Sequence, residues 1–115
     1  MNFFRWQKGR QETGYEKMLL ATAKWPIAFD IYLLRFFPGH EIPPHKDEVE
    51  KGEHHRVNVI LKNAKEGGEF ICKDAIHNSR WIKYFRPDKS QHQVTKIIKG
   101  NRYVFSIGWI KHSQR

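Results

Sequence analysis

The chain has 115 residues, of which 39% are hydrophobic, 14% aromatic and 29% charged. This length and aromatic content predict one folded domain, 1–115, and exclude a disordered chain or a second catalytic domain. The single cysteine, Cys72, excludes an internal disulfide, and the longest apolar stretch, 27–37, is interrupted by Asp30 and Arg35. That stretch is shorter than the roughly 20 apolar residues of a membrane-spanning helix. Because no secretory signal is visible either, we expect a cytoplasmic protein that does not enter membranes.

The first segment of regular structure is expected near the N-terminus. Residues 11–24 contain many good helix formers, with Tyr15, Met18 and Leu19 at helical spacing. We therefore predict a short helix that ends before Trp25-Pro26, because the residue before a proline disfavours helical geometry. Residues 1–26 would then form a helical support for the remaining chain.

From residue 27 onward the sequence has the pattern of short β-strands. Runs of five to eleven residues are rich in Ile, Val, Phe, Tyr and Trp, and Gly, Pro, Asn or Asp separate them. These runs cover residues 27–37, 55–62, 69–73, 79–86, 92–98 and 101–110. The sequence therefore predicts a mainly β fold, a sandwich or barrel, with its core over 27–110.

Three residues from two of these regions suggest a metal site. His45 and Asp47 form a His-x-Asp pattern, and residues two apart on extended chain project to the same face. Alone, the pattern is equally consistent with a solvated turn. His92 begins a later strand and completes a set of two histidines and one carboxylate, which is the ligand set of many non-haem Fe(II) oxygenases. Other histidines could replace these ligands, although surface roles are commoner for them: His40, His54, His55, His77 and His112.

The last predicted strand places a charged residue on an inward face. Alternation along 101–110 puts Arg102, Val104 and Ser106 on one face and aromatic or apolar residues on the other. If the first face points into the barrel, the Arg102 guanidinium is buried. A buried guanidinium without a partner is costly, so a carboxylate on a bound ligand is its natural counterpart.

Taken in order, these motifs resemble a known enzyme family. RFFPGHEIPPHKD (35–47), LKNAKEGGEF (61–70) and FRPDKSQHQVTKIIKGNRYVFSIGW (85–109) resemble the Fe(II)- and 2-oxoglutarate-dependent oxygenases, nearest to their prolyl-hydroxylase-like branch. The resemblance spans residues 34–109, about two-thirds of the chain, and extends to a Gly-Gly-Glu turn and a Gly-x-Arg pair.

The resemblance implies both a fold and an activity. The fold would be a double-stranded β-helix, a jelly-roll or cupin-like barrel. His45, Asp47 and His92 would hold Fe(II), and Arg102 would bind the distal carboxylate of the cosubstrate 2-oxoglutarate. With dioxygen, such an enzyme hydroxylates a C–H bond while it decarboxylates 2-oxoglutarate.

The sequence departs from the family at two places. Phe36 and Ile60 stand where many relatives have tyrosine, so hydroxyl contacts to 2-oxoglutarate must come from elsewhere. Asn58 and Ser106 are our candidates, with plain packing as the alternative. Arg56 shares the face of Asn58 and could reach the pocket, but we expect it to form an exposed ion pair.

The charge distribution bears on the partner. Lys and Arg number 21 against 12 Asp and Glu, and residues 80–115 carry nine basic residues and one acidic. Such an excess favours a polyanionic partner, nucleic acid or an acidic protein segment, although it could also serve solubility alone. We favour a macromolecular substrate, because so short a chain leaves little material for a lid over a small molecule.

Two other functions are consistent with the sequence. A cupin-type metal-binding protein without 2-oxoglutarate chemistry would keep the three ligands but would not need Arg102. A basic nucleic-acid-binding module would use aromatic residues among the basic ones of the C-terminal third, such as Trp81 and Tyr84. In that module the three metal ligands would be coincidental.

Overall fold

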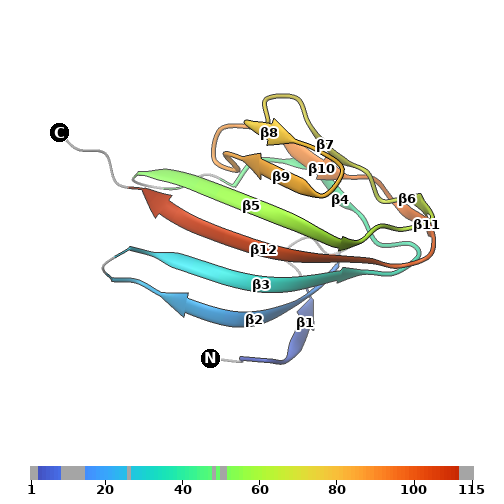
Figure 1. The fold of residues 1–115 in the computed structure, drawn as a ribbon, viewed down its shortest axis with the longest axis horizontal. Helices are drawn as coiled ribbons and strands as arrows, with labels where there is room; N and C mark the ends of the chain where they lie inside the picture. The colour runs from blue at the N-terminus through green and yellow to red at the C-terminus, as the bar shows by residue number, and fades with distance from the viewer. Residues whose placement is uncertain (1–2, 9–14, 26, 48, 50–51, 112–115) are drawn as a thin grey trace.

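The computed structural model describes residues 3–8, 15–25, 27–47, 49 and 52–111. These residues form antiparallel β-sheets (Figure 1). The largest sheet contains, in spatial order, β1 (Trp6–Lys8), β2 (Glu16–Ala23), β3 (Phe29–Phe36), β12 (Arg102–Lys111), β5 (Glu53–Lys62), β9 (Ile82–Phe85) and β8 (His77–Asn78). A smaller sheet contains β4 (Ile42–His45), β10 (His92–Val94) and β7 (Phe70–Cys72), and a separate pair contains β11 (Ile97–Lys99) and β6 (Glu66–Gly67).

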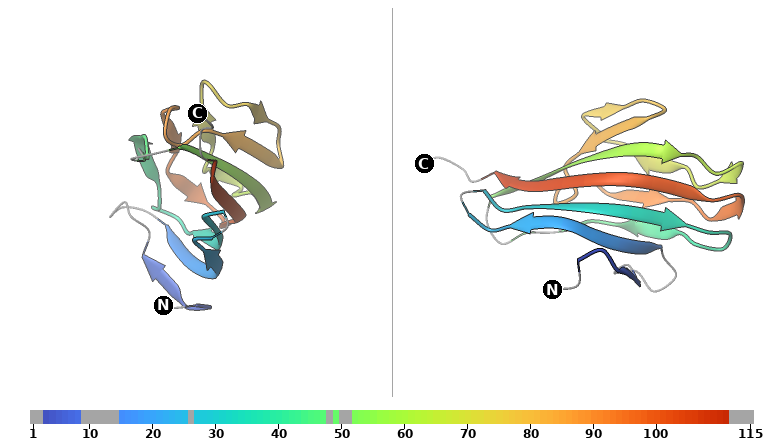
Figure 2. Two further views of the ribbon diagram at one scale, coloured as in Figure 1. Left: turned by 90° about the vertical axis from the view of Figure 1, so that its left-hand side faces the viewer. Right: turned by 60° about the horizontal axis from the view of Figure 1, so that its bottom comes forward.

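The large sheet is curved, and the small sheet lies on its concave side (Figure 2). Strand β12 is the long central strand, paired with β3 on one side and β5 on the other. Its side chains alternate between buried and half-buried positions along Arg102–Trp109. The predicted alternation is therefore confirmed, with Arg102, Val104 and Ser106 facing the interior.

The predicted N-terminal helix is wrong. Residues Glu16–Ala23 form β2, which pairs with β3 along its length and with β1 on its other edge. Helix-forming side chains are tolerated there because the backbone N–H and C=O groups form hydrogen bonds with two neighbouring strands. These bonds outweigh the weak local preference for a helix. Residues 11–14 of the predicted helix lie outside the described part of the chain, and none of the described segments is a helix that could span a membrane.

The apolar core is small and lies where the sheets meet. It consists of the buried side chains Phe36, Ile60, Val94, Ile97 and Val104. These come from β3, β5, β10, β11 and β12, so the core ties the two sheets and the strand pair together. Burial of such side chains is worth about 1.5–3 kcal/mol each.

The β6–β11 pair requires glycine at one position. Gly67 has a φ of +80°, and a Cβ added there would lie 2.1 Å from the carbonyl oxygen of Lys96. Only glycine fits both the backbone conformation and the close approach. The Gly-Gly-Glu motif thus serves this contact between strands.

Candidate metal centre and its cavity

The small sheet brings the three predicted ligands together. His45 is the last residue of β4, His92 is the first of β10, and the two are direct partners in the antiparallel register. Asp47 follows two residues after His45, and its backbone N–H donates to the carbonyl oxygen of Pro87 at 2.7 Å. That bond holds the segment after β4 against the loop that leads to His92.

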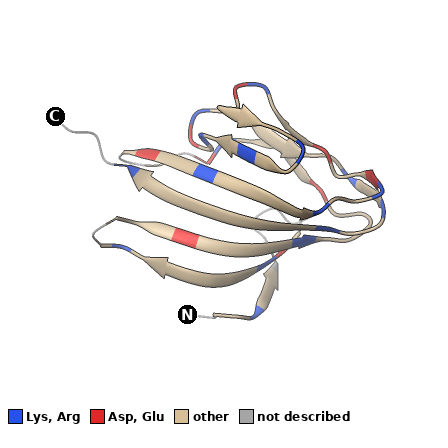
Figure 3. Ribbon diagram, viewed as in Figure 1, with Lys and Arg blue, Asp and Glu red and all other residues tan. Residues whose placement is uncertain are grey.

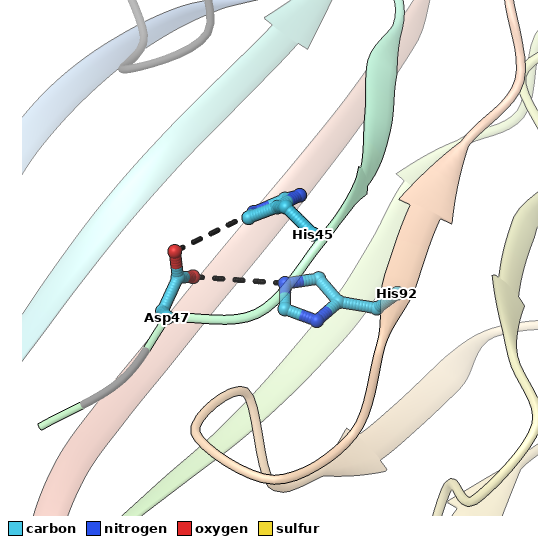
Figure 4. Close-up of side chains that lie close together, drawn as sticks. All are labelled: His45, Asp47 and His92. Carbon is cyan, nitrogen blue, oxygen red and sulfur yellow. Dashed lines mark ion pairs between the residues drawn. The ribbon is translucent and has the colours of Figure 1, made fainter.

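The three side chains point toward one another (Figure 4). The Nε2 atom of His45 lies 3.5 Å from one oxygen of Asp47, and the Nε2 atom of His92 lies 3.6 Å from the other. The candidate ligand atoms all lie within 4.8 Å of one another. One ion could therefore contact all three residues.

Backbone carbonyls orient both imidazole rings. The Nδ1 atom of His45 lies 2.8 Å from the carbonyl oxygen of Pro43, and that of His92 lies 2.9 Å from the carbonyl oxygen of Ser90. Because a carbonyl oxygen only accepts, Nδ1 carries the hydrogen in each ring. Each Nε2 therefore points toward Asp47 and is the ring nitrogen that would bind a metal, as in histidines that ligate metals.

The third ligand is ionised. Burial raises the pKa of the Asp47 carboxyl, but hydrogen bonds and charge from His45 and His92 outweigh burial. The pKa of Asp47 consequently lies well below its usual range. Two imidazole nitrogens and one carboxylate thus converge, which is a ligand set suited to a divalent cation.

These ligands line a cavity of about 210 Å³ between the two sheets. The opposite wall includes Arg102, Asn58 and Ser106, the residues that we expected to contact a cosubstrate. The structure therefore brings all six candidate residues to one cavity, although their role in binding a cosubstrate stays a prediction.

Arg102 is buried, and no acidic side chain among the described residues neutralises its charge. Its side chain is 2% exposed, and it forms no ion pair with any acidic residue in the described part of the chain. Its Nε atom has no hydrogen-bond partner among those residues, and its guanidinium lies 5.0 Å from the ring centre of Phe36. Burial lowers the pKa of Arg102 to about 10, so the group remains charged near neutral pH.

Asn58 and Ser106 belong to a directed hydrogen-bond chain. The Ser106 hydroxyl donates to Oδ1 of Asn58 at 2.6 Å, and Nη1 of Arg56 donates to the Ser106 oxygen at 2.7 Å. Nη2 of Arg56 donates to Asp30 at 2.6 Å. The amide oxygen of Asn58 is thereby fixed toward Ser106, so its amide N–H groups remain as donors.

Arg56 lines the cavity, where the sequence analysis expected an exposed ion pair instead, and Asp30 was not predicted there. The ion pair predicted for Arg56 is present, but the side chain is only 16% exposed and lines the cavity. Gly108 makes room for it, since a Cβ at that position would lie 2.1 Å from Nη2 of Arg56. The register of β5, β12 and β3 places the three residues side by side, and a period-2 pattern alone could only put Arg56 on the inward face.

The alternative histidines that the structure describes do not join the candidate metal site. In the part of the chain that the structure describes, His45, Asp47 and His92 are the group of three that could hold an ion. His40 accepts a hydrogen bond from the backbone of Phe37, and His55 contacts Tyr84. His112 lies outside the described residues.

Comparison with known proteins gives similarity in structure alone. No family model and no curated protein matches the chain. Several solved structures resemble it at low sequence identity, and three of them are described below. The viral collagen prolyl hydroxylase vCPH from Paramecium Bursaria Chlorella virus-1, solved as a 2OG complex, is 16% identical, with a TM-score of 0.64 over 88% of this chain and 81% of that one.

The other two resemble the chain to a similar extent. KdgF from Halomonas sp. is 16% identical, with a TM-score of 0.60 over 95% of this chain and 88% of its own. An RmlC-like cupin protein from Desulfovibrio desulfuricans is 17% identical, with a TM-score of 0.55 over 96% and 93% of the two chains. The chain therefore has the β fold shared by cupins and 2-oxoglutarate oxygenases, with a site that could bind a metal.

Proposed function

We propose that the protein is an Fe(II)- and 2-oxoglutarate-dependent oxygenase that hydroxylates its substrate. One observation carries this proposal: a buried, unpaired guanidinium, Arg102, lines the same cavity as His45, Asp47 and His92. A metal-binding protein without a carboxylate-bearing ligand has no use for that charge. The resemblance of the sequence to the prolyl-hydroxylase-like branch supports the same assignment.

The residues of the cavity fit the two groups that the reaction requires. Asp47 and the two Nε2 lone pairs would hold Fe(II), which readily takes imidazole and carboxylate ligands. Arg102 would pair with the distal carboxylate of 2-oxoglutarate, because the guanidinium offers parallel donors to a carboxylate. The cavity of about 210 Å³ is smaller than the roughly 300–1,000 Å³ of sites for drug-sized ligands, which suits a small dicarboxylate.

The chain itself contributes positioning and exclusion of water. When bound, Fe(II) and 2-oxoglutarate supply dioxygen activation that oxidises a C–H bond and releases succinate and carbon dioxide. Asn58 would donate its amide N–H groups to the cosubstrate, while Ser106 and Arg56 hold that amide in place. Phe70 and Phe85 line the cavity beside the ligands and keep that side apolar.

Binding of 2-oxoglutarate tests the proposal directly. We expect the anaerobic Fe(II) protein to develop a visible charge-transfer band on titration with 2-oxoglutarate. Arg102→Gln should remove or weaken that response by at least tenfold while metal binding is kept. Arg35→Gln is the matched control, because Arg35 lies on the adjacent strand and pairs with Glu16 instead.

The same titration separates the oxygenase from a cupin-type metal protein. A protein that binds Fe(II) through His45, Asp47 and His92 but shows no 2-oxoglutarate response would contradict the proposal and favour the cupin reading. Succinate release in the presence of dioxygen, with and without candidate substrates, would then establish whether turnover occurs.

For the substrate, we propose a macromolecule that carries negative charge. The support is the net charge of +9. Figure 3 shows Lys and Arg spread over several strands and loops, with Asp and Glu among them. Retention of an RNA oligonucleotide or an acidic peptide at low salt, lost as salt rises, is the expected result. No retention of either probe would contradict it.

A further inference from the structure

The inner face of the large sheet carries more positive charge than its acidic residues neutralise. Arg56 pairs with Asp30, and Lys17 lies 5.0 Å from the ring centre of Tyr32. Arg102 and Lys83 form no ion pair with any described acidic residue. These two residues therefore contribute positive charge that no described acidic residue neutralises.

Lys83 faces inward on β9, the strand next to the edge strand β8. It is the register partner of the buried Asn58 on β5, and so shares the inner face with it. Its Nζ atom donates to Oδ1 of Asn78 at 2.7 Å and to the carbonyl oxygen of Ser79, both of which are neutral. Burial and the nearby charge of Arg102 both lower the pKa of Lys83, so the two cations are close enough to repel.

Both cations line a second hollow, separate from the metal cavity. It has a volume of about 430 Å³, and Arg80 and Lys65 add two further basic side chains to its lining. Glu69 is the one acidic residue in that lining. Arg102 lines this hollow and also the metal cavity, so its side chain forms part of the wall between them.

We propose that this hollow is a second anion site that takes a phosphate group, bound between Lys83 and Arg102 with Arg80 and Lys65 at its rim. Two unpaired positive charges match a phosphate dianion, whereas a monocarboxylate would neutralise only one of them. The hollow is also larger than a phosphate ion, which leaves room for the rest of a phosphate monoester. The proposal goes beyond the oxygenase activity and does not depend on a bound metal.

The shared residue predicts a link between the two sites. An anion on one side of Arg102 reduces the attraction that its charge exerts on an anion on the other side. Phosphate should therefore weaken 2-oxoglutarate binding, and 2-oxoglutarate should weaken phosphate binding by the same factor. This link, unlike the phosphate site itself, rests on the proposed function.

The experiment uses the metal-free protein without 2-oxoglutarate. Inorganic phosphate is titrated at constant ionic strength, with chloride as the exchanged anion, and binding is followed by amide NMR shifts. We expect saturable shifts around Lys65, Lys83 and Arg102, and a tenfold or greater loss of affinity in Lys83→Gln. A second arm with adenosine monophosphate tells whether a phosphate ester binds as well as the free ion.

Control variants make either outcome informative. Lys62→Gln removes an exposed lysine of β5 outside the hollow and should leave phosphate affinity unchanged. Arg80→Gln should weaken phosphate binding less than Lys83→Gln does. It replaces Lys83→Gln as the test variant if Lys83→Gln fails to fold. Shifts that chloride reproduces, or equal affinity in Lys83→Gln and Lys62→Gln, would overturn the phosphate site. That result would leave the charge-transfer test of the oxygenase unaffected.

Discussion

Among the individual residues, Arg102 carries a buried charge that has no ion-pair partner in the described part of the chain. In a folded protein such a charge costs several kcal/mol, and its replacement by an apolar side chain of similar length is often neutral or stabilising. Arg102 lies beside Phe36 and near Val104, so an apolar replacement would join an existing cluster. The residue is therefore better explained by a ligand than by the stability of the fold.

We expect Arg102→Met to raise the free energy of unfolding of the metal-free protein by about 1–3 kcal/mol. Binding of 2-oxoglutarate should be lost in the same variant. Urea denaturation measures the first effect, and the Fe(II) titration measures the second. A loss of more than about 1 kcal/mol would show that Arg102 stabilises the fold through a partner in the protein, and would weaken the case for a ligand.

His54 should make stability depend on pH. Burial lowers its pKa first, and the charge of Arg56 lowers it further, against opposing contributions from Asp30, Asp47 and Asp88. Its Nδ1 atom is buried without a hydrogen-bond partner among the described residues. Because the folded pKa lies below the unfolded value of about 6.5, the unfolded chain takes up a proton first as the pH falls.

The stabilisation due to neutral His54 is therefore complete above pH 6.5 and is lost as the pH falls through the folded pKa. We expect His54→Gln to lose less stability than the wild type between pH 7.5 and pH 5.5. Urea denaturation at both pH values measures the difference. Parallel losses in the two proteins would exclude His54 as the source.

For individual residues, the sequence predicted the candidate metal ligands but not the residues around them. His45 and Asp47 were recognisable because a spacing of two on extended chain is a local property. Arg102 followed from alternation along a single strand. The contact of Arg56 with Asp30 and Gly108 was missed because it depends on the register between three strands, which no local pattern specifies.

Among the elements, β12 and β5 depend on each other through Gly108. The Arg56 guanidinium lies against this glycine and is held there by Asp30 and Ser106. Gly108→Ala would place a methyl group 2.1 Å from Nη2 of Arg56 and must displace the side chain. The displaced guanidinium would lose its ion pair and its bond to Ser106.

We expect Gly108→Ala to lower the free energy of unfolding by about 1–3 kcal/mol. In an Arg56→Ala background the same substitution should cost less, since the clash is gone. A double-mutant cycle with urea denaturation gives the coupling between the two positions. If the costs of Gly108→Ala and Arg56→Ala in unfolding free energy simply add, then Gly108 is required for the backbone conformation of β12 and not to make room for the Arg56 side chain.

The β2 segment shows why local sequence misassigned one element. Met18, Leu19 and Ala21 favour a helix when the segment is considered alone. In the fold, the strand pairs with β3 from Glu16 to Ala23 with one register shift between Leu19 and Ala21. The remaining strands were easier to predict, because β-branched and aromatic residues and flanking turns marked them locally.

In the whole molecule, the candidate ligands bring together parts of the chain that are distant in sequence. β4 and β10 are short strands of a three-stranded sheet. Asp47 follows His45 by two positions, whereas His92 follows Asp47 by 45 positions. Without a cation, the two Nε2 atoms and the Asp47 carboxylate contact one another. A bound divalent ion would replace that arrangement with bonds that exist only in the folded state.

Metal binding should therefore stabilise the protein. At a free metal concentration 100 times Kd, the expected gain is about 2.7 kcal/mol, which corresponds to an increase in Tm of roughly 10 °C for a domain of this size. Mn(II) can stand in for Fe(II) in air, and thermal denaturation with and without it measures the shift. Addition of a chelator should reverse the shift.

Two histidine variants distinguish this site from nonspecific metal binding. His92→Ala removes one ligand and should abolish most of the increase in Tm, whereas His77→Ala removes an exposed histidine of β8 and should keep it. Equal shifts in both variants would mean that the ion binds elsewhere. Because a metal stabilises by binding only the folded state, that outcome would contradict the assignment of His45, Asp47 and His92 as its ligands, whatever activity the protein has.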